Sequence, residues 1–137
     1  MEPRLSFVTL GVADLKRATD FYAKTLCLPQ LKTPPAIAFF ELGRTYLALY
    51  PRAALAADAG LPDRGHPAPG AFPGFTLAHN VRSADEVDQL LAEVKAGGGR
   101  IIHRGQARPE FNGYSGYFAD PDGFLWEVAY NPHFPHV

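Results

Sequence analysis

The feature that most constrains this chain is a pattern of elements that occurs twice along its 137 residues. In the first copy, residues 5–12 place apolar side chains at every second position, which is typical of a strand. Asp14 follows as a candidate N-cap, and residues 15–26 carry apolar side chains at helical spacing. Pro29 ends this predicted helix because proline cannot continue the backbone hydrogen bonding.

The second copy repeats the order with clearer signals. Residues 75–81 alternate like a strand, and Ser83 with Glu86 forms a capping box, in which each side chain bonds to the other's free backbone amide. Glycines 97–99 end the helix that follows, because glycine tolerates a left-handed turn. The remaining predicted strands are 30–33, 37–42 and 46–50 in the first copy and 101–104, 114–119 and 124–130 in the second. Each copy therefore predicts the order β-α-β-β-β.

A segment rich in proline and alanine separates the two copies. We predict one domain over residues 1–137, with a first module at about 4–50, a linker at 51–74, a second module at about 75–131 and a tail at 132–137. The linker contains one short predicted helix near residues 53–59. The predicted fold class is α+β. Each sheet packs one face under its helix, and the other faces of the two sheets surround a shared cavity.

Charge and composition exclude several classes of protein. The net charge is −1, and like charges do not cluster in runs, so we expect neither a nucleic-acid partner nor a membrane partner. No segment approaches about 18 uninterrupted apolar residues and the start lacks a signal-peptide pattern, which predicts a cytoplasmic protein. The single cysteine, Cys27, excludes an intrachain disulfide. Its place near the end of an amphipathic helix predicts a buried side chain.

Alternation along each strand assigns side chains to the two faces of the sheets. The apolar set belongs under the helices and comprises Val8, Leu10, Val12, Leu47, Leu49, Phe75, Leu77, Val81, Phe124, Trp126 and Val128. The opposite set is predicted to line the cavity and comprises Phe7, Thr9, Tyr46, Ala48, Tyr50, Thr76, Ala78, Asn80, Tyr117, Leu125, Glu127 and Ala129.

Glu127 is the exception within its strand, because it lies between Trp126 and Val128 in a run that otherwise predicts burial. A charged group there costs several kcal/mol unless it is paired, bound to a metal or neutralised. One interpretation is a structural carboxylate bonded to a neighbouring tyrosine, asparagine or arginine. The other is a functional group that serves as a ligand, an acid/base or a substrate anchor.

Both ends of the chain resemble the vicinal oxygen chelate superfamily, the glyoxalase/bleomycin resistance protein/dioxygenase type. Residues 8–15 (VTLGVADL) are similar to its opening strand and helix, and residues 116–123 (GYFADPDG) with Trp126 and Glu127 are similar to its closing hairpin. The resemblance implies paired βαβββ modules, an open, barrel-like mixed sheet around a cavity, and a homodimer.

The resemblance also implies where a metal ion would be held. Metal-dependent members place His, Glu or Gln at the positions that correspond here to Phe7, Ala48, Thr76 and Glu127. Only Glu127 offers a suitable ligand atom, whereas a divalent metal needs two or three protein ligands. We therefore expect no metal cofactor. A metal-dependent glyoxalase-like or dioxygenase-like enzyme with atypical ligands stays as an alternative.

The five histidines offer few substitute ligands. His79 falls on the helix-facing side of its strand, and His103 falls in an edge-like strand. His66 lies in the linker and could approach Glu127 only if that loop crosses the cavity. His133 and His136 lie in a proline-containing tail, where no regular helix would align them.

Two accounts of function follow. In the first, the chain binds a small organic molecule in an aromatic-lined cavity, where Glu127 holds a cation or a donor group. The aromatic walls are Phe7, Tyr46, Tyr50 and Tyr117, and the neutral hydrogen-bonding groups are Thr9, Thr76 and Asn80. In the second, it is a metal-independent isomerase, epimerase or lyase acting on a small carbonyl compound. Glu127 would then move a proton, while Tyr117 or Asn80 would stabilise the oxyanion.

Overall fold

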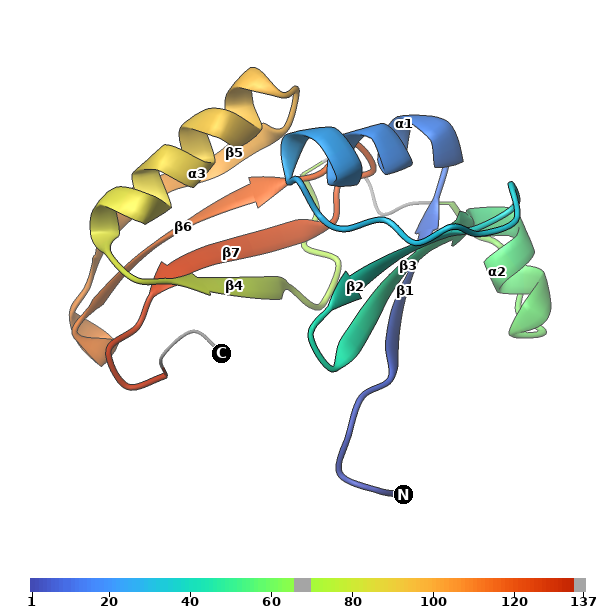
Figure 1. Cartoon of the computed structure of the whole chain (residues 1–137), viewed down its shortest axis with the longest axis horizontal. Helices are drawn as coiled ribbons and strands as arrows, with labels where there is room; N and C mark the ends of the chain where they lie inside the picture. Colours follow the sequence, from blue (N-terminus) through green and yellow to red (C-terminus); the bar gives the residue numbers. More distant parts are fainter. Residues whose placement is uncertain (66–69, 135–137) are drawn as a thin grey trace. The chain divides into compact units, whose positions relative to one another are not determined.

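The structure is a computed structural model that describes residues 1–65 and 70–134. The chain forms two compact units, Met1–His66 and Pro67–Val137, and their boundary falls inside the predicted linker (Figure 1). In the described part of the chain, no helix is both long enough and apolar enough to cross a membrane.

The first unit is a three-stranded sheet with helices. The strand order is β1-β3-β2, with β1 parallel to β3 and β2 antiparallel to β3. The first helix continues without a break into a π-helical turn, Phe21–Thr25. The elements are β1 (Phe7–Val12), α1 (Leu15–Asp20), β2 (Ala38–Leu42), β3 (Thr45–Pro51) and α2 (Arg52–Asp58). The short helix predicted in the linker is confirmed as α2.

The second unit is a four-stranded sheet in the order β4-β7-β6-β5, with β4 parallel to β7 and the other pairs antiparallel. Its elements are β4 (Leu77–Val81), α3 (Ala84–Ala96), β5 (Arg100–Arg108), a 3-10 turn (Pro109–Phe111), β6 (Gly113–Ala119) and β7 (Leu125–Tyr130). In both units the strand that comes first in the sequence pairs in parallel with the strand that comes last in the sequence, β1 with β3 and β4 with β7. The predicted repeat and the α+β class with paired modules are therefore confirmed.

The predicted strand at 30–33 is wrong as a strand. Only Gln30 pairs with β2, through an isolated antiparallel bridge to Phe40. Pro29, directly before the bridge, has no N–H to donate to a ladder, so the pairing does not extend in that direction. On the other side the Leu31 amide donates to the Phe39 carbonyl oxygen at 2.9 Å, and the chain then runs into the turn that contains Pro35. The bridge still occupies the equivalent position in the fold. It lies beside β2 in the first unit, as β5 lies beside β6 in the second unit.

The strand predicted at 101–104 is longer than expected. It runs from Arg100 to Arg108 and pairs with β6 to its end, with register irregularities around His103. These irregularities let the strand bend while it continues past Gly105. The extension brings Arg108 into the sheet, where the sequence prediction had placed no element.

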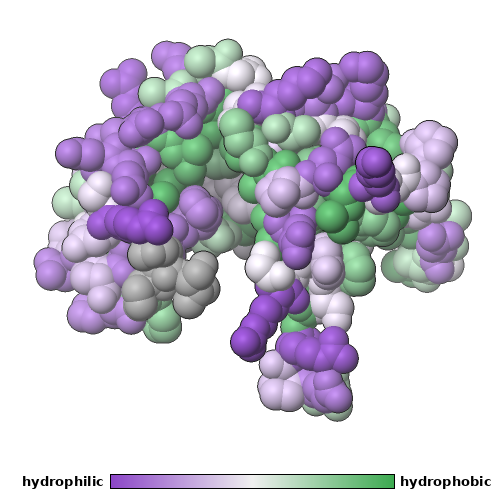
Figure 2. Space-filling view, viewed as in Figure 1, coloured by the Kyte–Doolittle hydropathy of each residue, from purple (hydrophilic) through white to green (hydrophobic). Residues whose placement is uncertain are grey.

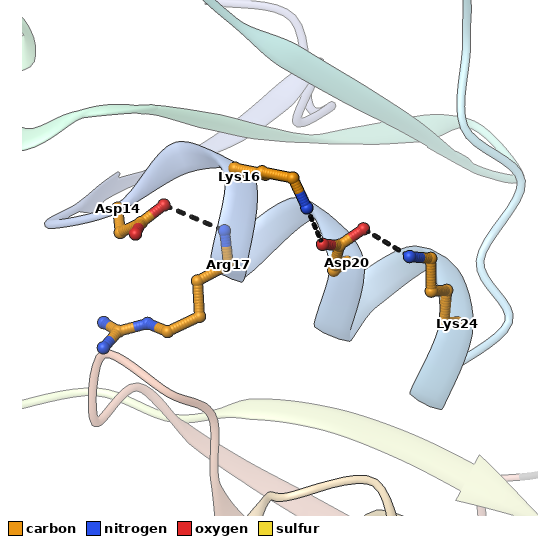
Figure 3. A network of polar contacts seen from close by, with 5 residues as sticks. All are labelled: Asp14, Lys16, Arg17, Asp20 and Lys24. Carbon is orange, nitrogen blue, oxygen red and sulfur yellow. Dashed lines mark hydrogen bonds and ion pairs between the residues drawn. The ribbon is translucent and has the colours of Figure 1, made fainter.

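The first helix begins as the sequence predicts. The Asp14 carboxylate accepts a hydrogen bond from the Arg17 amide at 2.9 Å, which confirms the N-cap (Figure 3). Further along the helix, Asp20 pairs with Lys16 at 2.6 Å and with Lys24 at 2.8 Å. The hydrogen bonds from the two lysines lower the pKa of Asp20 to about 2. Hydrophilic side chains cover this outer side of α1 (Figure 2).

Cys27 is exposed, which corrects the prediction that it is buried. The residue adopts a φ of 52°, in the left-handed region, directly after the helical segment ends. This turn at the helix C-terminus removes Cys27 from the apolar stripe of the helix.

The third helix is capped differently from a full capping box. The Glu86 amide donates to the Ser83 hydroxyl at 3.2 Å, as predicted. The Glu86 carboxylate, however, accepts from the Arg82 amide at 2.9 Å rather than from the Ser83 amide. At the other end, Gly98 has a φ of 92°, in agreement with the predicted glycine termination.

We predict that Ser83→Ala lowers the free energy of unfolding of the second unit by about 1 kcal/mol, because the Glu86 amide loses its acceptor. Urea denaturation followed by the fluorescence of Trp126, the only tryptophan in the sequence, measures the change. Ser83→Asn keeps a capping acceptor and should stay within a few tenths of a kcal/mol of the native value. Equal stability of Ser83→Ala and the native protein would refute the cap.

Each sheet buries one face under its helix, as alternation predicts. Val12, Leu47 and Leu49 are at most 1% exposed, and Tyr22 of the π-helical turn packs on Phe40 with ring centroids 5.9 Å apart. In the second unit the fully buried positions include Val87, Val94, Phe118 and Val128. Phe75 is a correction. It is 41% exposed, because strand pairing starts two residues later and does not hold it under the helix.

Candidate functional site

The second sheet has one face that packs on α3 and one that points away from it. On β6, the Tyr114 hydroxyl reaches Asp88 of α3, and Gly116 lies directly against Leu91 of α3. Ser115, which lies between them, and Tyr117, which follows Gly116, therefore point to the opposite face. We call this opposite side the open face of the second sheet.

Tyr117 and Glu127 lie side by side on the open face. They are direct partners in the register of β6 and β7, and both are half-buried. The Glu127 carboxylate lies close enough to the Tyr117 hydroxyl to act on it as a hydrogen-bond acceptor and as a negative charge. The charge that the sequence places in mid-strand thus has a tyrosine partner, and an adjacent donor and acceptor can serve either structure or chemistry.

Burial raises the pKa of the Tyr117 phenol above its ordinary value, and the hydrogen bond and the negative charge of Glu127 raise it further. The nearby Arg108 guanidinium acts in the opposite direction and lowers it. Tyr117 is therefore held as a neutral phenol through the physiological range. Its proton stays available as a hydrogen-bond donor.

We predict that the Tyr117 phenol titrates above about 10, the ordinary value for tyrosine. A raised folded-state pKa means that its contribution to stability is present below pH 10 and is lost as the pH rises through the folded value. NMR of tyrosine labelled at the phenolic carbon measures this titration, and Tyr117→Phe assigns the signal. A Tyr117 midpoint at or below about 10 would contradict the raised pKa that burial and Glu127 together produce, and an unchanged midpoint in Glu127→Gln would remove Glu127 as a cause.

Arg108 and Ser115 complete a polar cluster that we define as Arg108, Ser115, Tyr117 and Glu127. The Arg108 Nε donates to the Ser115 hydroxyl at 2.9 Å, and its guanidinium carbon lies 6.0 Å from the centroid of the Tyr117 ring. Ser115 is fully buried and Arg108 is half-buried. Sequence reasoning missed both residues. Alternation with Tyr117 could have found Ser115, whereas Arg108 lies beyond the predicted end of its strand.

The corresponding face of the first sheet is aromatic. Phe7 stacks on Tyr46 with ring centroids 5.2 Å apart, and contacts Phe39 with centroids 5.6 Å apart. Phe7 is 48% exposed, and Tyr46 and Phe39 are half-buried. Phe39 was not among the predicted residues, although it occupies the position in β2 that Tyr117 occupies in β6. This face offers ring surface but little hydrogen-bonding capacity.

The other predicted lining residues differ in accessibility. Thr9 and Thr76 are exposed, and Thr76 precedes the start of β4. Tyr50 is half-buried, and Ala48 is 1% exposed. The Asn80 side-chain amide donates to the Phe134 carbonyl oxygen at 2.9 Å, so one of its N–H groups is already engaged.

The strand registers match the four positions expected to hold a metal. Ala48 pairs with Thr9 in the first unit as Glu127 pairs with Ala78 in the second, and Phe7 and Thr76 each lie two residues before these partners. In the first unit a stacked Phe7 ring and a buried Ala48 methyl offer no donor. Within residues 1–65 and 70–134, no group of three or more His, Cys, Asp or Glu side chains could hold an ion. The donor set at these positions does not fit a divalent metal.

The histidines do not gather around Glu127 in the described part of the chain. His79 is exposed on β4, and His103 places its Nδ1 2.7 Å from the Arg104 carbonyl oxygen. His66 and His136 lie outside the described residues.

Comparison with known proteins identifies a family. The model of the Glyoxalase/Bleomycin resistance protein/Dioxygenase superfamily matches residues 4–128. A search of curated proteins found no match.

The chain is similar to several solved structures. A glyoxalase-related enzyme from Fulvimarina pelagi is 33% identical, with a TM-score of 0.87, covering 97% of this chain and 91% of its own. A lactoylglutathione lyase from Agrobacterium tumefaciens is 27% identical with a TM-score of 0.67, covering 93% of each chain. A glyoxalase/bleomycin resistance protein/dioxygenase from Nocardioides is 23% identical with a TM-score of 0.79, covering 99% of this chain and 88% of its own.

Proposed function

The chain belongs to the Glyoxalase/Bleomycin resistance protein/Dioxygenase superfamily, and from that premise we propose that it binds a small organic molecule without a metal ion. The polar cluster on the open face of the second sheet is the centre of this proposed site. The half-buried Tyr117 ring within the cluster supplies stacking surface for apolar or planar parts of the ligand.

The observation that carries the proposal is the Tyr117–Glu127 pair with Arg108 at the Tyr117 ring. A half-buried carboxylate, a neutral phenol and a guanidinium on neighbouring strands provide acceptor, donor and positive charge within one small area. Such convergent polar groups orient a small ligand, and rigid strands keep them in place. None of these interactions requires a metal ion.

A second candidate function is metal-independent catalysis on a small carbonyl compound. The pairing of Tyr117 with Glu127 in the β6–β7 register supports it, because Glu127 could accept a proton while the neutral Tyr117 hydroxyl donates to a developing oxyanion. The relative from Fulvimarina pelagi is described as a glyoxalase-related enzyme, which gives this alternative support by similarity.

A thermal-shift screen of small aromatic, hydroxy and carbonyl compounds tests the binding proposal. A ligand that binds only the folded state raises its stability by about 2.7 kcal/mol at a concentration of 100 Kd. We expect Tyr117→Phe to weaken the best ligand about 2-fold to 10-fold, which corresponds to one lost hydrogen bond. Tyr114→Phe, which removes a hydroxyl from the opposite face of the same strand, is the matched control. Equal weakening by both variants would contradict the site.

Glu127→Gln separates the two functions. An enzyme that uses Glu127 as its base should lose most turnover of a ligand from the screen while still binding it. A binding protein should show no turnover in either form. Turnover that survives in Glu127→Gln would remove Glu127 from the proposed chemistry.

A further inference from the structure

We propose that Arg108 is the anchor for a carboxylate, so that the ligand of this protein is a small organic acid. This inference rests on the proposed function and names the chemical class of its ligand. It depends on the way in which Arg108 is held on the open face of the second sheet.

The Arg108 side chain is held by two contacts that leave its outer nitrogens unused. Its Nε donates to the Ser115 hydroxyl at 2.9 Å, and its guanidinium carbon lies 6.0 Å from the Tyr117 ring centroid. Ser115 is fully buried, so this anchor point is rigid. Over residues 1–65 and 70–134, neither Nη atom of Arg108 forms a hydrogen bond or an ion pair.

Arg108 is half-buried, and among residues 1–65 and 70–134 its guanidinium has no ion pair with a carboxylate. Arginine side chains in such settings usually pair with a carboxylate. Glu127 is the candidate within the cluster, but it lies on β7 and Arg108 lies on β5, with Tyr117 of β6 between them. The Glu127 carboxylate acts on the Tyr117 hydroxyl. Tyr117 thus contacts Arg108 through its ring and Glu127 through its hydroxyl, and both charged groups keep capacity for a ligand.

The chemistry of the two charges selects the ligand. The guanidinium fork matches the two oxygens of a carboxylate, with parallel N–H donors in one plane. The negative Glu127 on the other side of Tyr117 disfavours a dianion such as a phosphate monoester. A carboxylate at Arg108, with an apolar or donor-bearing body extending past Tyr117, satisfies both groups.

Benzoate and benzamide are matched probes for this inference, because they share a ring and differ in charge. NMR titration of the native protein measures both dissociation constants, and the shifted amides locate the site. We expect benzoate to bind about tenfold or more tightly than benzamide, as one charge-assisted contact implies. Inorganic phosphate should bind less tightly than benzoate.

Arg108→Gln should weaken benzoate binding far more than benzamide binding and so abolish the preference for benzoate. Arg104→Gln is the matched control, since it removes the same charge from an exposed position of the same strand and should change benzoate binding less than about twofold. Ser115→Ala, which leaves Arg108 in place but removes its acceptor, provides a second variant if Arg108→Gln folds poorly. It should also reduce the preference.

The outcomes distinguish this inference from the proposed function. Benzamide and benzoate binding equally at the polar cluster would overturn the carboxylate anchor and leave the binding site standing. Arg104→Gln and Arg108→Gln weakening benzoate equally would also overturn it, because the effect would then be general charge. Benzoate that binds away from the polar cluster, or does not bind at all, would overturn the carboxylate anchor, whereas the proposed function fails only if no ligand from the screen binds at the cluster.

Discussion

Phe118→Ala should lower the free energy of unfolding of the second unit by about 3–5 kcal/mol. Phe118 is 1% exposed and lies on the face of β6 that packs on α3. Its ring is parallel to that of Trp126 on the neighbouring strand, with centroids 6.2 Å apart. Truncation removes this buried ring and leaves a cavity. The cavity stays largely open because the sheet packs on α3 and can relax only in part.

Urea denaturation followed by Trp126 fluorescence measures this loss at the site of the change. Phe72→Ala is the matched control, because Phe72 is 67% exposed and its removal should cost less than about 0.5 kcal/mol. A loss below about 1 kcal/mol for Phe118→Ala would mean that the ring is not part of the core.

Gly116→Ala should destabilise the second unit by about 1–3 kcal/mol, although it adds a single methyl group. A Cβ at this position would lie 2.6 Å from Leu91 Cδ1, 2.8 Å from the His103 carbonyl oxygen and 2.9 Å from the Gly105 nitrogen. The Leu91 side chain can move, but the other two atoms belong to the backbone of β5. Relief of the contacts therefore requires β5 to shift relative to β6.

Ala78→Val is the control for Gly116→Ala, because it adds bulk at an exposed position of β4 in the same sheet. A β-branched residue is favourable in a strand, so this variant should be neutral within about 0.5 kcal/mol. The same urea denaturation compares the two variants. Native-like stability of Gly116→Ala would mean that β5 and α3 pack more loosely around β6 than the contacts indicate.

Much of the fold could be predicted because its signals are local. Period-two alternation identified β1, β3 and β7, and the apolar stripe identified α3. The doubling of the pattern then determined the paired modules. The predictions that were wrong depended on backbone geometry rather than on side-chain pattern. Cys27 adopts a left-handed conformation, which an apolar stripe does not predict. The 30–33 segment, which follows Pro29, forms a single bridge instead of a strand.

The site could be predicted only in part, for a physical reason. Glu127 was identifiable because a charge among buried residues conflicts with its surroundings. Its partner Tyr117 follows from hairpin register across a tight turn. Arg108 is different, because it enters the cluster through a strand extension with register irregularities, and these arise from packing between β5 and β6. Alternation of side chains within one strand does not predict how β5 and β6 pair.

The central claim is that the polar cluster binds a small organic molecule without a metal ion. The most direct measurement is an amide NMR titration of chelator-treated protein with the best ligand from the screen. We predict saturable shifts centred on Arg108, Ser115, Tyr117 and Glu127, with an affinity unchanged when Zn²⁺, Ni²⁺, Fe²⁺ or Mn²⁺ is added. Binding that appears only after a divalent metal is restored, or shifts that avoid β6 and β7, would contradict the account.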